Sequence, residues 1–112
     1  MNTARINLEQ FRTQSRTTKS RVFTGRDRGK EVREKSKFDE LFENSDKLEI
    51  NIPNDIFSIT PSFLEELLYN MVLKYGKEKV LSKLSIIGTY DIDQSLAQAT
   101  ERILQEKNGL QN

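Results

Sequence analysis

A glycine- and arginine-rich stretch, Gly25-Arg-Asp-Arg-Gly-Lys30, holds the residues best suited to binding an anion. A phosphate-binding P-loop needs four residues between its glycines and Ser or Thr after its lysine. Here three residues separate the glycines and Glu31 follows the lysine, so a nucleotide-hydrolysing site is not predicted. Free N–H groups at a helix start still bind phosphate or carboxylate, and arginines assist as bidentate donors. The candidate anion-binding residues are Arg26, Arg28, Gly29, Lys30 and Arg33. The alternative is a helix start with ordinary solvated arginines.

A second group of polar residues begins a predicted helix at Thr60. Thr is a good N-cap acceptor, and Pro61 suits the first helical position. Ser62 followed by Glu65 offers a competing capping box two residues further on. Glu65 and Glu66 do not form a catalytic pair, because adjacent helical positions point apart. Capping is the simpler explanation for Glu65.

The composition excludes several kinds of chemistry. The chain has no cysteine and no histidine, so thiol nucleophiles, disulfides, the usual zinc sites and histidine acid–base catalysis are absent. We therefore expect no enzyme, no catalytic residues, no metal and no cofactor.

No apolar run approaches membrane-spanning length and no signal-peptide core is present, which predicts a cytoplasmic protein that does not bind membranes.

The strongest element signals come from the middle of the chain, 48–75. Apolar and polar residues alternate over 48–52, which is typical of a half-buried strand. A short apolar run, 56–59, leads into a helix that carries a wide apolar stripe and ends at Gly76. A helical turn or two over 77–83 and a compact strand over 84–87 follow. A last helix begins near Asp91 or Asp93.

The earlier part of the chain gives weaker signals. Apolar alternation at 4–8 predicts an edge strand, 13–20 reads as a loop, and 21–24 as a short strand. Residues 25–44 predict a helix broken near Ser36, with so thin an apolar stripe that we expect it to be exposed.

Strands alternating with helices predict an α/β two-layer sandwich with parallel central strands, three or four in number, and helices mainly on one face. The expected organisation is an edge strand or flexible segment over 1–20, one domain over 21–106 and a frayed tail over 107–112.

Charge is unevenly distributed along the chain. Up to Ser36 there are ten Lys and Arg against four Asp and Glu, whereas the remainder has eight against thirteen. One explanation is that basic and acidic residues on solvent-exposed surfaces fall in different parts of the chain without a functional reason. A sharper interpretation is a basic surface that meets an acidic partner or a nucleic acid. That gives an alternative function, a phage or mobile-element accessory protein that binds nucleic acid or a nucleoprotein complex.

The segment Ile59-Thr-Pro-Ser-Phe-Leu-Glu-Glu-Leu67 resembles the signature of a family of small bacterial STAS-like domains of unknown function. That family carries Thr/Ser-x-Ser-Phe-x-Asp/Glu-Glu-Leu after a strand. Its upstream Arg-x-x-Gly matches Arg26-Asp-Arg-Gly29, and the resemblance extends from about Val22 to Leu104. The wider STAS group includes the anti-sigma factor antagonists, in which a serine at the corresponding helix start is phosphorylated by a partner kinase.

The resemblance implies a non-enzymatic regulatory domain that docks a protein partner, such as a kinase or a regulatory ATPase-like protein. The antagonists' Asp-Ser-Ser-Gly falls on Thr60-Pro61-Ser62-Phe63, so the usual acceptor position is a proline, and Ser62 is the family's own serine. The candidate docking or phospho-acceptor residues are Ser62 and Thr60, with Pro61, Phe63, Glu65 and Glu66 as partner-binding residues. A phosphoryl group there would add nearly two negative charges where the helix dipole favours them.

Overall fold

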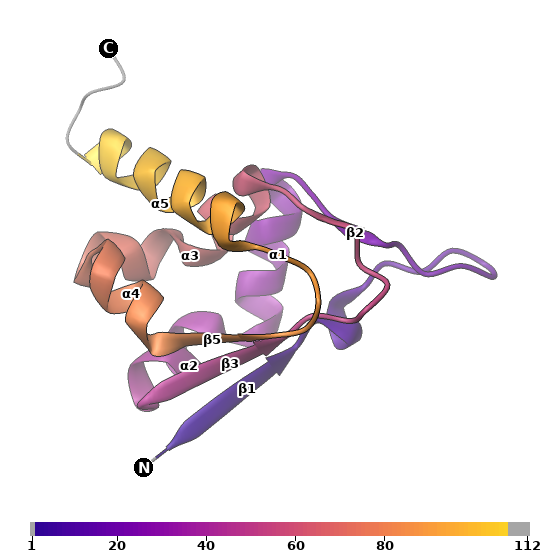
Figure 1. The fold of residues 1–112 in the computed structure, drawn as a ribbon, viewed down its shortest axis with the longest axis horizontal. Coiled ribbons are helices and arrows are strands. Elements are labelled where there is room, and N and C mark those ends of the chain that lie inside the picture. Colours follow the sequence, from indigo (N-terminus) through magenta and orange to yellow (C-terminus); the bar gives the residue numbers. More distant parts are fainter. Residues whose placement is uncertain (1, 108–112) are drawn as a thin grey trace.

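The computed structural model describes residues 2–107 and has a three-stranded parallel sheet at its base (Figure 1). The strands are β1 (Thr3–Asn7), β3 (Lys47–Asn51) and β5 (Leu84–Ile87), in the order β1-β3-β5. The edge strand expected near the N-terminus is confirmed, since β1 pairs only with β3 among the described strands. The α/β class and its parallel central strands are confirmed as well.

The two faces of this sheet differ sharply in polarity. Pairing aligns Ile6 with Ile50 and Ile50 with Ile86, so these apolar side chains share one face. Arg5 and Glu49 are paired on the opposite face, where the Arg5 Nε lies 2.7 Å from a Glu49 carboxylate oxygen. Helices therefore cover one face of the sheet, as predicted, while the other carries polar side chains.

The helices that cover the sheet bury most of the apolar surface. They are α1 (Arg26–Ser36), α2 (Phe38–Asn44), α3 (Pro61–Tyr75), α4 (Lys77–Lys83) and α5 (Asp93–Lys107), with a short 3₁₀ helix η1 (Leu8–Phe11) after β1. The longest of them, α3, packs against both α1 and α5, and Figure 1 shows α3 and α5 on the same side of the sheet. The predicted break after α3 is confirmed at Gly76, whose φ of 88° a side chain would strain.

The break predicted near Ser36 is also confirmed, because Lys37 takes a left-handed conformation, with φ of 57°, between α1 and α2. The expected exposure of these helices is wrong. Val32, Phe38 and Phe42 are fully buried. The kink lets the two short helices present separate apolar residues to the same core, so neither needs a long stripe.

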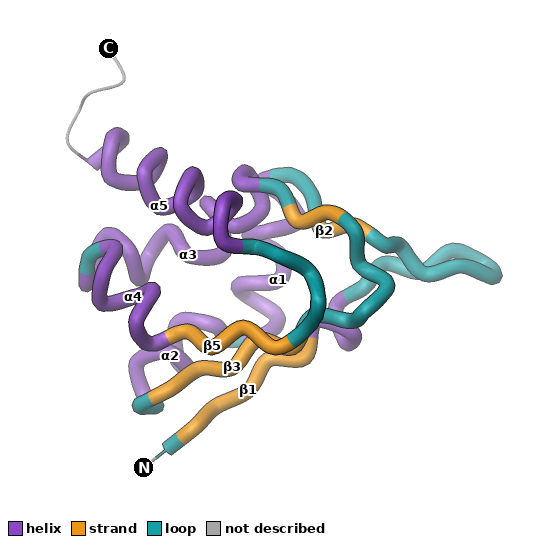
Figure 2. Tube along the Cα trace, viewed as in Figure 1, coloured by secondary structure: helices purple, strands orange, loops and turns teal. Residues whose placement is uncertain are grey.

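Two very short strands form a second parallel pair beside the main sheet. They are β2 (Val22–Phe23) and β4 (Ser58–Ile59). Ahead of β2, a loop closed by a bridge between Gln14 and Lys19 extends away from the body of the molecule, drawn in teal at the right of Figure 2. The tail predicted to fray over 107–112 lies, from residue 108 onward, outside the described residues.

Candidate functional site

The β2–β4 pair brings two helix starts together. Phe23 aligns with Ile59, and the N–H of Thr60 donates to the Phe23 carbonyl at 3.1 Å. Each strand runs directly into a helix, β2 into α1 and β4 into α3. Because the strands are parallel, the N-termini of α1 and α3 lie next to each other, and the positive ends of two helix dipoles face the same surface.

Thr60 is the residue that caps α3. Its Oγ1 accepts hydrogen bonds from the N–H groups of Phe63 and Gly25, each at 3.4 Å, and so joins the two helix starts. Ser62 lies inside the first turn with its Oγ 3.1 Å from Thr60 Oγ1. The capping box predicted for Ser62 and Glu65 is therefore wrong.

The Glu65 carboxylate lies in the interior, where it is held by arginines from two other helices. Its side chain is 1% exposed, and its Oε2 accepts a hydrogen bond from Arg26 Nη1 at 2.9 Å. This hydrogen bond raises the pKa of Arg26. Arg102 Nη1, from α5, lies 3.7 Å from Oε1. Among the described residues no donor hydrogen-bonds to Oε1, so half of this buried carboxylate is unsatisfied.

Glu66 extends these contacts along α3. Its backbone carbonyl accepts a hydrogen bond from Arg33 Nη1. Its carboxylate oxygens lie 3.7 Å from Arg26 and 3.7 Å from Arg33. We name the five residues Arg26, Arg33, Glu65, Glu66 and Arg102 the Glu65 cluster. It joins α1, α3 and α5 and holds one more positive charge than negative.

Close packing of α1 on α3 keeps this cluster together. Gly29 is buried, and a Cβ there would lie 2.2 Å from the Phe63 carbonyl oxygen. Phe63 in turn packs against Phe23 with ring centroids 5.3 Å apart. Gly29 therefore allows the two helices to approach, and its buried position leaves it no direct contact with a bound anion.

An open hollow of about 540 Å³ lies where the two helices begin. Its lining residues are Thr24, Gly25, Arg26, Asp27, Arg28, Glu31 and Ser62. Arg28 Nη1 donates to Glu31 at 2.6 Å, and its guanidinium carbon lies 5.9 Å from the centre of the Phe23 ring. Two arginines, two carboxylates and a serine hydroxyl thus meet at one surface.

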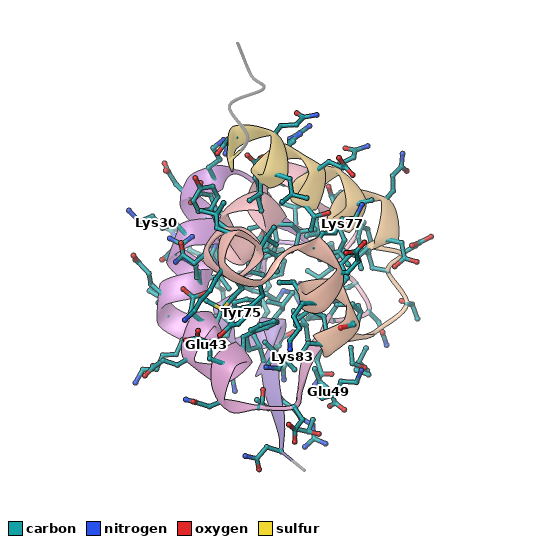
Figure 3. The ribbon with its side chains drawn as sticks, turned by 90° about the vertical axis from the view of Figure 1, so that its left-hand side faces the viewer. Lys30, Glu43, Glu49, Tyr75, Lys77 and Lys83 are labelled. Carbon is teal, nitrogen blue, oxygen red and sulfur yellow. The ribbon has the colours of Figure 1, made fainter. Side chains whose placement is uncertain are left out.

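The structure brings only some of the predicted site residues to this surface. Thr60, Pro61, Ser62 and Glu66 are half-buried, so each keeps some accessible surface. Phe63 and Glu65 are fully buried and have no surface to offer a docked partner. Lys30 is exposed on α1 (Figure 3) and is not among the residues that line the hollow.

The arginines of the predicted anion site already have carboxylate partners. Arg26 contacts Glu65, Arg28 contacts Glu31, and Arg33 contacts Glu66. A bound anion must compete with these contacts. Sequence reasoning missed Arg102, since nothing in the local pattern of α5 points to a glutamate 37 positions earlier in the chain.

Comparison of the chain with protein-family models, curated proteins and solved structures found no match in any of the three. Within residues 2–107, no three acidic side chains gather closely enough to hold a metal ion. None of the helices in that part of the chain is both long and apolar enough to span a membrane.

Proposed function

We propose that this chain is a non-enzymatic, STAS-like regulatory domain that docks a protein partner at the start of α3, and that phosphorylation of Ser62 switches the docking. The observation that carries the proposal is the position of Ser62. Its side chain lines a hollow formed by two adjacent helix starts, together with Arg26 and Arg28.

The docking surface has a rigid frame. Thr60 fastens the two helix starts to each other, and Pro61 fixes the backbone at the first position of α3. The accessible groups are Thr60, Pro61, Ser62 and Glu66, while Phe63 and Glu65 support them from below. A surface that is already ordered loses little conformational entropy when a partner binds.

The surroundings of Ser62 favour an added negative charge. A phosphoryl group carries nearly two charges at neutral pH, and helix N-termini stabilise anions through free N–H groups and the dipole. Arg26 and Arg28 line the same hollow and can form charge-assisted hydrogen bonds with phosphate oxygens. Phosphorylation would thus change the charge of the docking surface without unfolding it. The resemblance to STAS domains suggests a kinase or a regulatory ATPase-like protein as the partner.

Site-specific crosslinking tests where the partner docks. The chain has no cysteine, so Ser62→Cys and Thr3→Cys each carry one benzophenone label. Thr3 is exposed on β1, in the sheet rather than at the helix starts, and serves as the matched control. In a host extract, the label at 62 should give a discrete adduct that excess unlabelled protein removes, and the label at 3 should not.

Equal adducts from both positions, or no competed adduct from position 62, would reject docking at this surface. Arg28→Glu then tests the charge requirement, because Arg28 lines the hollow but is not part of the Glu65 cluster. The Arg28 side chain is 19% exposed and its partner Glu31 is 42% exposed, so we expect the loss of this pair to cost about 1 kcal/mol and to lower the melting temperature by about 4–8 °C. The folded variant should crosslink less.

A further inference from the structure

Glu65 is a buried charge with only one of its oxygens hydrogen-bonded. Arg26 donates to Oε2 at 2.9 Å, whereas none of the described residues donates a hydrogen bond to Oε1, and Arg102 Nη1 lies 3.7 Å from that oxygen. Burial at 1% exposure makes a carboxylate without a cation costly. Arg102 is about half exposed, so its side chain is free to move the short distance onto Oε1.

Arg26 has access to two anionic positions. Its side chain is 52% exposed, and it bonds Glu65 while also lining the hollow that contains Ser62. Ser62 and Glu65 are three positions apart on α3 and therefore share one side of the helix. A phosphate on Ser62 would compete with Glu65 for the same guanidinium.

We propose that Arg26 is an exchangeable contact that links the phosphorylation state of Ser62 to how firmly Arg102 anchors α5. A kinase transfers the terminal phosphoryl group of a nucleoside triphosphate to Ser62 Oγ, releasing the diphosphate and the hydroxyl proton. Arg26 then moves from Glu65 to the phosphate, and Arg102 closes onto Glu65. This regulation rests on the proposed function, because it needs Ser62 as the phospho-acceptor.

The direction of the exchange follows from charge. A phosphate presents nearly two charges and three acceptor oxygens to an arginine, while a carboxylate presents one charge. Glu65 cannot be left alone in the interior, so the loss of Arg26 draws in the nearest other cation, which is Arg102. The inner face of α5, with Ala99 and Ile103 fully buried, keeps its packing. Phosphorylation therefore adds a hydrogen bond between Arg102 and Glu65 that anchors α5 to α3, and it does not displace the helix.

Amide hydrogen exchange tests this exchange on the isolated protein, without a partner. Phosphoserine is incorporated at position 62 during translation, and exchange is followed in peptides from residues 99–106. We expect about tenfold slower exchange than in the unmodified protein, the factor that one charge-assisted hydrogen bond supplies at the weak end of its range.

Three variants isolate the contact. Unmodified Arg26→Gln should show the same slowing, because it frees Glu65 for Arg102 without any phosphate. Arg28→Gln is the matched control, since Arg28 lines the hollow but does not touch Glu65, and it should leave α5 unchanged. Phosphorylated Arg102→Gln should lose the slowing.

The outcomes separate this inference from the docking proposal. Unchanged exchange of 99–106 in both the phosphorylated protein and Arg26→Gln would overturn the exchange of contacts, whatever the crosslinking shows. Slower exchange in both, with the unmodified and the phosphorylated protein competing equally as unlabelled proteins against the crosslink from position 62, would support the exchange of contacts and reject phosphorylation as a switch of docking.

Discussion

Two ion-pair clusters in this protein are built in opposite ways. In the Glu65 cluster the acid is buried, and its partners Arg26 and Arg102 are about half exposed. In the second, which we name the Arg12 cluster (Glu9, Arg12, Lys19 and Asp55), the base is buried. Arg12 is 5% exposed, while its partners Glu9 and Asp55 keep much of their surface.

The clusters also differ in how completely the buried charge is satisfied. Arg12 donates to the Ser20 carbonyl, to Glu9 and to both carboxylate oxygens of Asp55, at 2.8 to 3.0 Å. Glu65 has one hydrogen bond and one oxygen without a donor. A satisfied buried charge fastens loops together, whereas an unsatisfied one marks a position where contacts can change. The comparison makes Arg12 a stabilising contact and Glu65 the centre of the regulation that we propose.

The largest effect is expected when Glu65 loses both cations. The double variant Arg26→Gln, Arg102→Gln removes both cations that pair with the buried Glu65 carboxylate in residues 2–107, which should cost about 3–5 kcal/mol in the free energy of unfolding. Each single variant should cost about 1 kcal/mol or less, because the remaining arginine replaces the missing one. Urea denaturation of the four proteins measures the non-additivity. Additive losses would show that the two arginines act independently, and the comparison would then fail.

A smaller loss is expected when the helices of the Glu65 cluster are forced apart. Gly29→Ala places a Cβ 2.2 Å from the Phe63 carbonyl oxygen, so α1 must shift away from α3. We expect about 1–3 kcal/mol of destabilisation, the usual cost of overpacking. Gly25→Ala is the control without a steric clash, since nothing lies within 4 Å of a Cβ there. Any loss of stability in that variant comes from backbone strain, because Gly25 has a φ of 89°. A melting temperature for Gly29→Ala equal to wild type would disprove the close approach.

Much of the fold could be predicted from local pattern. The strands β3 and β5 and the helix α3 each carry enough apolar residues in one short stretch to reveal their period. The burial of α1 and α2 could not be predicted, because Val32 and Phe38 lie on opposite sides of the kink at Lys37 and share a core only in three dimensions. The pairing of β2 with β4 involves two residues from each strand, too few for a sequence signal.

The helix start at Thr60 was predictable in position, whereas the contacts around it were not. Thr60 followed by Pro61 is a local helix-start signal, and Thr60 does cap α3. Glu65 three positions after Ser62 is an equally local signal for a capping box, yet Glu65 turns inward to Arg26 instead. The ion pair outcompetes the local hydrogen bond because both partners are charged and Glu65 is buried. A pattern within one helix cannot reveal a partner on another.

Acidification should act on the Arg12 cluster through its carboxylates. Lys19 and then Arg12 lower the pKa of Glu9, and Arg12 lowers the pKa of Asp55. Because the folded-state pKa values are depressed, their contribution is present above the usual pKa values and is lost as pH falls below about 4 and through the lowered folded-state pKa values. Arg12→Gln should melt at a lower temperature than wild type at pH 7, and its melting temperature should fall less on acidification. Parallel pH profiles for the two proteins would contradict the assignment.

The smallest effect on stability is expected for substitution of Ser62, because Thr60 and not Ser62 accepts the hydrogen bonds that cap α3. Thr60→Ala removes the acceptor for the N–H groups of Phe63 and Gly25, so it should cost about 1 kcal/mol. Ser62→Ala loses only a hydroxyl–hydroxyl contact at 3.1 Å and should change the free energy of unfolding by less than about 0.5 kcal/mol. Urea denaturation of both variants compares them directly. If Ser62→Ala costs as much as Thr60→Ala, Ser62 caps the helix, and its hydroxyl is occupied by a structural role. Alternatively, Ser62→Ala leaves the free energy of unfolding unchanged, and kinase treatment no longer changes its affinity for the partner. The Ser62 hydroxyl is then free for modification, as the regulation that we propose at the Glu65 cluster requires.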